Sequence, residues 1–110
     1  MVPSGRREKI ETMLAEQPDD TFLRYSLAME LQKEGLHDES LQRFRELTAN
    51  TPPYVPAFFM AAKMLVHLQR IPEARSFLRD GIEQARSQGD GHAASEMAEL
   101  LAALGQPPSA

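Results

Sequence analysis

The residues with the clearest potential for chemistry are three histidines, and their spacing argues against a shared site. His37, His67 and His92 fall in different segments of the chain. His92 and Glu96 are four residues apart, which places both on one face of a helix, but two ligands do not hold a metal ion. The sequence has no cysteine, which excludes a thiolate zinc site and a cysteine nucleophile. We therefore predict solvated histidines, no metal and no cofactor.

Acidic pairs at helical spacing are the second candidate for chemistry. Glu96 and Glu99 are three residues apart, and Glu30 and Glu34 are four apart, which is typical of a solvated helix face. The sequence contains no phosphate-binding loop, glycine-rich dinucleotide motif, nucleophile elbow or HExxH motif. These observations predict that the protein is not an enzyme.

The composition restricts the class of protein and its partners. A length of 110 residues fits one domain. The balance of 12 Lys and Arg against 16 Asp and Glu argues against affinity for nucleic acid or an anionic membrane. The most apolar stretch, residues 54–68, contains Pro56 and Lys63 and is shorter than a membrane span, for which about 20 residues are needed. The N-terminal charges are not followed by an apolar run, so we expect no signal peptide and a cytoplasmic protein.

The elements that position these residues are predicted to be helices. Alternating β-branched runs are absent, whereas Leu, Ala, Met, Glu, Arg and Gln, which favour helices, dominate the chain. Apolar residues recur at three- and four-residue steps between Pro and Gly breakers, as they do along one face of a helix. The pattern predicts six helices, over residues 5–17, 20–34, 38–50, 55–69, 72–87 and 91–104.

Residues that favour helix starts precede several of these segments. Asp19 or Asp20 stands before the second helix, Asp38 at the third and Asp90 before the sixth. Pro72 falls in the first turn of the fifth helix, where its fixed φ angle is compatible with a helix.

A period of 34 residues aligns the breakers and the apolar residues together. Under this shift Pro18 falls on Pro52, and Ile10 falls on Phe44 and then on Leu78. A third copy continues when two residues are inserted near Gln88, Gly89 and Asp90. Further positions then coincide in the same way: Tyr25 with Phe59, Ala28 with Ala62 and Ala98, and Leu31 with Leu65 and Leu101.

With this period and these residues the chain resembles the tetratricopeptide repeat family, whose unit is a pair of helices. The family pattern alternates aromatic, small and large apolar residues and ends on a proline. At the pattern positions the first repeat has Arg24, Leu27, Ala28, Leu31, Ser40, Phe44 and Pro52, and the second has Phe58, Ala61, Ala62, Leu65, Ala74 and Leu78. Four positions depart from the pattern. Arg24 stands where an aromatic residue is expected, Leu31 and Leu65 stand where tyrosine is expected, and Arg86 stands where the second proline is expected. The resemblance implies an all-α, right-handed superhelical array of antiparallel helix pairs, an α-solenoid of about six helices.

The register divides the chain into one domain and a tail. We predict a single repeat domain over 1–104, made of an N-terminal half-repeat (6–18), two repeats (19–52 and 53–88) and a C-terminal capping helix (90–104). Half-repeats at the ends are expected to shield the array from solvent. The tail, residues 105–110, is expected to be disordered.

The resemblance also implies a function, which is to bind a protein or peptide partner in a concave groove without catalysis. The first helix of each pair lines this groove in the family. On the register above, the groove residues are Tyr25, Met29, Phe59, Met60, Lys63, His67, Glu96 and Glu99. The apolar members would anchor side chains of an extended or helical peptide. No asparagine falls in this set, since Asn50 lies in a turn, so we do not expect a carboxylate clamp.

Two alternatives stay open on the residues alone. In the first, Phe59 and Met60 are core residues that pack against neighbouring helices. In the second, the chain is a homo-oligomeric scaffold, a homodimer for example, that associates through its end helices. The contacts would then be Ile10, Met13 and Leu14 at one end, or Leu100 and Leu104 at the other.

Overall fold

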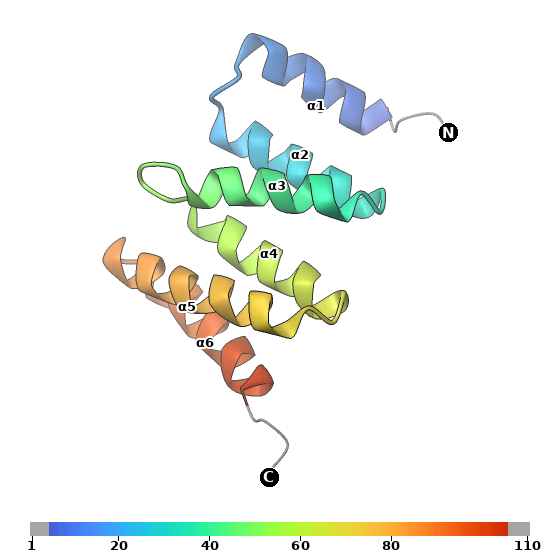
Figure 1. Ribbon diagram of the computed structural model, residues 1–110. Helices are drawn as coiled ribbons and strands as arrows, with labels where there is room; N and C mark the ends of the chain where they lie inside the picture. The colour runs from blue at the N-terminus through green and yellow to red at the C-terminus, as the bar shows by residue number, and fades with distance from the viewer. Residues whose placement is uncertain (1–4, 106–110) are drawn as a thin grey trace. The chain divides into compact units, whose positions relative to one another are not determined.

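The computed structural model describes residues 5–105, and every regular element in this range is an α-helix. The six helices confirm the predicted all-α class (Figure 1), and their ends lie within two residues of the predicted ones. They are α1 (Gly5–Glu16), α2 (Thr21–Lys33), α3 (His37–Thr48), α4 (Val55–His67), α5 (Ile71–Ser87) and α6 (Gly91–Leu104). The predicted disordered tail lies, apart from Gly105, outside the described residues.

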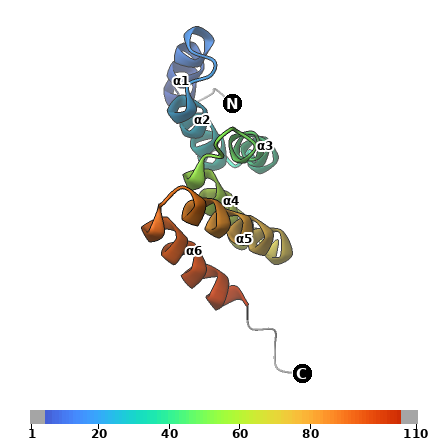
Figure 2. The ribbon, with the colours of Figure 1, turned by 90° about the vertical axis from the view of Figure 1, so that its left-hand side faces the viewer.

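The chain forms two compact units, Met1–Tyr54 and Val55–Ala110. The first contains α1, α2 and α3, and the second contains α4, α5 and α6. Within each unit, successive helices contact each other and run in opposite directions (Figures 1 and 2). In the second unit α4 also contacts α6. The antiparallel helix pairs are therefore as predicted, while the division into a half-repeat, two repeats and a cap stays a prediction.

Two of the predicted helix starts are confirmed as N-caps. The Asp20 carboxylate accepts a hydrogen bond from the amide of Leu23 at 2.8 Å, and the Asp90 carboxylate accepts one from Ala93 at 3.0 Å. Pro72 lies in the first turn of α5 as expected. Asp38 is not an N-cap, because α3 already begins at His37. Its carboxylate lies instead in the first turn, where it interacts favourably with the helix dipole.

The helices α2 and α4 end in the same way, one period apart. Gly35 has a φ of 80° and Gln69 a φ of 61°, so both adopt the left-handed conformation that often ends a helix. The next amide, that of Leu36 or Arg70, donates to the carbonyl five residues earlier, at 2.9 and 2.8 Å respectively. Gly35 adopts this conformation without strain, whereas Gln69 carries a Cβ that disfavours it.

The first unit has an apolar core and an ionic contact between α1 and α2. Buried Ile10, Leu27 and Leu31 form one cluster of this core, and Leu14 and Leu36 pack against them. Of the residues predicted to contact a second copy at this end, Ile10 is buried against α2 and Leu14 is half-buried, and the homodimer itself stays a prediction. Met13 remains 44 % exposed.

Glu30 and Glu34 do not form the solvated face that their spacing predicts. The Glu30 carboxylate is buried and lies 3.3 Å from Nε of Arg6, and that of Glu34 lies 3.1 Å from Nε of Arg7. Arg6 and Arg7 stand in the first turn of α1, where a positive charge opposes the helix dipole. The two glutamates of α2 compensate this charge, so the acidic pair joins two helices.

The second unit depends on small residues at its helix crossings. Gly81 of α5 is buried, and a Cβ built on it would lie 2.6 Å from both Sδ of Met97 and Cβ of Phe58. No side-chain carbon fits at that distance, so glycine allows α4 and α6 to approach α5 together. Ala61, Ala62 and Ala74 are fully buried in the same unit, which makes its core tightly packed and apolar.

Candidate binding surfaces

The face predicted to bind a partner on α4 is partly open. Phe59 and Met60 are half-buried, while the neighbouring Phe58 and Ala61 are in the core. The Lys63 ammonium lies 4.0 Å from the centroid of the Phe59 ring, within range of a cation–π interaction. The α4 face therefore presents an apolar ring with a positive charge over it.

The remaining predicted residues of the second unit are at the surface. His67 is the last residue of α4 and is exposed, as are Glu96 and Glu99 on α6. Nε2 of His92 lies 3.3 Å from Oε1 of Glu96, so the pair with helical spacing does form an exposed contact. Within residues 5–105 no group of three or more His, Asp or Glu side chains is arranged to hold a metal ion.

The two predicted residues on α2, Tyr25 and Met29, belong to the first unit and are half-buried. The Tyr25 ring makes edge contacts with Phe44 and Tyr54, with ring centroids 6.0 and 5.3 Å away. Burial, together with the neighbouring Tyr54, raises the pKa of the Tyr25 hydroxyl above its usual value. Tyr25 thus belongs to an aromatic cluster and presents only part of its ring to solvent.

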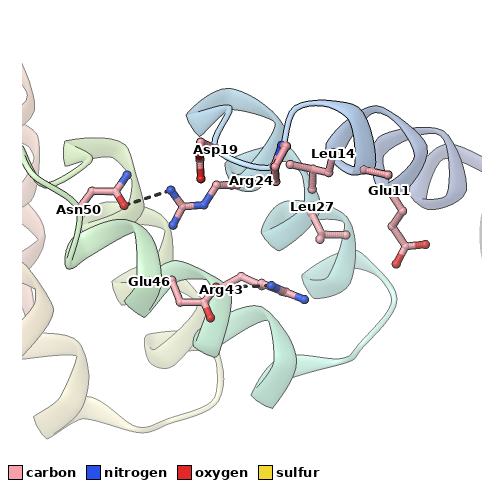
Figure 3. Close-up of a pocket in the computed structure, with 10 residues that line it drawn as sticks. Glu11, Leu14, Asp19, Arg24, Leu27, Arg43, Glu46 and Asn50 are labelled. Atoms are coloured by element: carbon pink, nitrogen blue, oxygen red, sulfur yellow. Dashed lines mark hydrogen bonds and ion pairs between the residues drawn. The ribbon is translucent and has the colours of Figure 1, made fainter.

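A cleft of about 620 Å³ in the first unit was not predicted from the sequence. Arg24 lies in it, and its Nη1 donates a hydrogen bond to Oδ1 of Asn50 at 3.0 Å (Figure 3). Arg43 and Glu46 of α3 form an ion pair along another wall, with N and O atoms 3.5 Å apart. The other lining residues come from α1, α2 and the turn between them: Glu11, Leu14, Ala15, Pro18, Asp19 and Leu27.

The sequence does contain a signal for this cleft, which is the departure of Arg24 from the repeat pattern. Phe58, one period later, fills the corresponding place in the second unit and is buried against Gly81. A guanidinium is not stable in such an apolar contact, because burying an unpaired charge is costly. Arg24 reaches a polar partner instead and lines the cleft.

Among residues 5–105, no helix combines the length and apolar character needed to cross a membrane. No family model and no curated protein matches the sequence. Solved structures do match. The solution NMR structure of a tetratricopeptide repeat domain protein from Salinibacter ruber is 31% identical, with a TM-score of 0.76, over 84% of this chain and 95% of that chain.

Two further structures extend this similarity. A crystal structure of a tetratricopeptide repeat domain protein from Salinibacter ruber is 31% identical, with a TM-score of 0.69, over 78% of this chain and 96% of that chain. The solution structure of a protein from Bordetella parapertussis is 26% identical, with a TM-score of 0.77, over 93% of this chain and 89% of that chain. Because the identity, the coverage and the 34-residue register agree, this chain belongs to the tetratricopeptide repeat family.

Proposed function

We propose that the chain is a non-catalytic interaction module that binds a segment of a partner protein on the α4 face, next to α6. The tetratricopeptide fold in general mediates protein–protein interaction, which supports this class of function. The observation that carries the proposal is the partial exposure of Phe59 and Met60 between core residues. Apolar side chains that remain accessible on a rigid helix are suited to anchor a peptide.

The charges around these residues suggest which peptides would bind. Lys63 and His67 supply positive or titratable groups on α4, whereas Glu96 and Glu99 supply negative ones on α6. A polarised surface of this kind would orient a peptide with charges of both signs around an apolar centre. Tyr25 and Met29 are proposed to serve the same role on α2. The cytoplasmic location stays a prediction from the composition.

A peptide library displayed on phage tests this proposal, because selection from a library does not require the partner to be identified. Peptides selected on the wild-type protein should lose binding to Phe59→Glu and to Met60→Glu, while the far-ultraviolet circular dichroism stays unchanged. Lys63→Glu should select peptides of altered charge. Gln42→Glu, an exposed change on α3, is the matched control and should retain binding.

Two results would contradict the proposal. One is that Phe59→Glu and Met60→Glu lose their helical signal, which would make these residues part of the core. The other is that both variants retain every selected peptide, which would place binding elsewhere on the chain.

A further inference from the structure

A second surface, in the second unit, lies between α5 and α6. It is a groove of about 440 Å³, whose lining residues are Arg79, Ile82, Arg86, Ala98, Leu101 and Ala102. Ile82 is buried and Leu101 half-buried, while both arginines are exposed. No acidic residue lines the groove. In the described part of the chain neither guanidinium has an ion-pair partner.

The repeat register shows what covers the equivalent surface elsewhere in the chain. Ala28 on α2 is covered by α3, whose Ser40 hydroxyl donates to the Ala28 carbonyl at 2.7 Å. Ala62 on α4 is fully buried, and so is Ala74 of α5, the residue one period after Ser40. Ala98, the third member of this series, is only half-buried and lines the groove. Within the described part of the second unit no helix lies over Ala98, so the groove has room for another helix.

The same register predicts which side chains of such a helix meet the arginines. Two periods separate Glu11, Leu14 and Pro18 of the first unit from Arg79, Ile82 and Arg86. Glu11, Leu14 and Pro18 line the 620 Å³ cleft. The same cleft is lined by Arg43 of α3 and by Asn50 of the turn after α3, and these two residues are seven positions apart. A helix seated in the groove in the same way would therefore direct two side chains, seven residues apart, towards Arg79 and Arg86.

We propose that the α5–α6 groove docks an amphipathic helix of a partner protein that carries two carboxylates seven residues apart. The partner helix also has a small residue three positions before its first carboxylate, just as Ser40 stands three positions before Arg43 in α3. This small residue of the partner lies over Ala98. Its apolar face packs on Ile82 and Leu101, while its carboxylates pair with the two arginines. The groove is separate from the α4 face described above, so the chain would have two binding surfaces.

The probe for this proposal is a synthetic peptide with the sequence of residues 36–50 and with Arg43→Glu and Asn50→Glu. A third change, Gln42→Lys, allows a lactam bridge to Asp38 on the exposed side of the helix, which stabilises the helix. The peptide keeps Ser40 and the apolar residues Leu41, Phe44 and Leu47 of α3. The bridged peptide that retains Arg43 and Asn50 is its control. Fluorescence anisotropy should show that the wild-type protein binds the acidic peptide about ten-fold more tightly than the control, because two contacts change from neutral or repulsive to attractive.

Protein variants locate the binding. Arg79→Glu with Arg86→Glu should weaken the acidic peptide about ten-fold and remove the preference over the control peptide. Arg43→Glu with Arg45→Glu makes the same change of charge in the first unit and should leave the affinity unchanged. Ala102→Gln, at an exposed position in the groove, should weaken both peptides without loss of fold.

Phe59→Glu separates this proposal from the function proposed above, since it should leave the affinity for the acidic peptide unchanged. Equal affinity for the two peptides, or no effect of the Arg79 and Arg86 substitutions, would overturn the proposal. Sedimentation equilibrium tests the other occupant. A dimer of the wild-type chain that Ala102→Gln dissociates would mean that a second copy occupies the groove, and the partner helix would be rejected.

Discussion

Arg24 in α2 and Phe58 in α4 stand one period apart, and the units around them are built differently. In the first unit Arg24 bonds to Asn50 in an open, charged cleft, and ion pairs connect α1 with α2. In the second unit Phe58 is buried against Gly81, and alanines line the helix contacts. Equivalent positions of the two units can therefore hold either polar or apolar side chains, provided that the residues around them differ in the same way.

Position 47 and position 81 show this coupled change most directly. They are one period apart, yet Leu47 is a fully buried side chain and Gly81 has none. Leu47 fills space in the first unit, where its partners leave room for it. Gly81 leaves space in the second unit, where Phe58 and Met97 fill it. Substitutions at both positions should therefore lower stability, at position 47 because a side chain is lost and at position 81 because one is added.

The largest effect is expected for Leu47→Ala. It removes buried methyl groups and leaves a cavity, which should lower the free energy of unfolding by about 3 kcal/mol. Urea denaturation followed by circular dichroism measures this loss. Gln42→Ala, on the exposed face of the same helix, should change stability by less than about 0.5 kcal/mol. A small effect at Leu47 would mean that the first unit collapses to fill the space.

Gly81→Ala is expected to have the next largest effect, although alanine favours helices. The new Cβ would overlap Met97 and Phe58, and such overpacking costs about 1–3 kcal/mol. A gain of about 1 kcal/mol in helix propensity offsets part of this. We expect a net loss of about 1 kcal/mol by urea denaturation. Gly91→Ala, where a Cβ meets no atom within 4 Å, is the matched control. Stabilisation by Gly81→Ala would show that α4 and α6 need no close approach.

The ionic contact of the first unit should contribute about 1 kcal/mol and should depend on salt. Arg7 and Glu34 are about four-fifths buried as side chains, with N and O atoms 3.1 Å apart. A double-mutant cycle of Arg7→Ala and Glu34→Ala should give a coupling energy of that size at low ionic strength. The coupling should fall in about 1 M NaCl, because salt screens charges. The same cycle on the exposed pair Arg43 and Glu46 should give less than half as much. Equal couplings would mean that burial adds nothing to the α1–α2 contact.

The smallest effect concerns the two equivalent helix ends. Gln69→Gly should stabilise the chain by about 0.5–1 kcal/mol, because glycine adopts a positive φ without a steric penalty. Gly35→Gln is the reciprocal change and should destabilise by a similar amount. Thermal denaturation compares both with the wild type. If neither variant shifts the melting temperature, the left-handed conformation at these ends contributes little to stability.

Much of the fold could be predicted because the period of 34 residues repeats short-range signals. The N-caps at Asp20 and Asp90 and the apolar stripes depend on residues three or four positions apart, which the sequence displays directly. The prediction for Asp38 is wrong by one position, because the chain leaving α2 through Gly35 already starts α3 at His37. The exposure of Phe59 and Met60 depends on how neighbouring helices pack, which helical spacing alone does not specify.

The helical class and the resemblance to the repeat family follow from the helix-forming composition and the 34-residue period of the chain. Which residues face one another between helices is visible only in the folded chain. Glu30 and Glu34 have the spacing of a solvated face but meet Arg6 and Arg7, and Arg24 reaches Asn50, 26 residues away. The reason is physical: periodicity follows from hydrogen bonds within a helix, whereas ion pairs, clefts and close approaches depend on the packing of side chains distant in sequence.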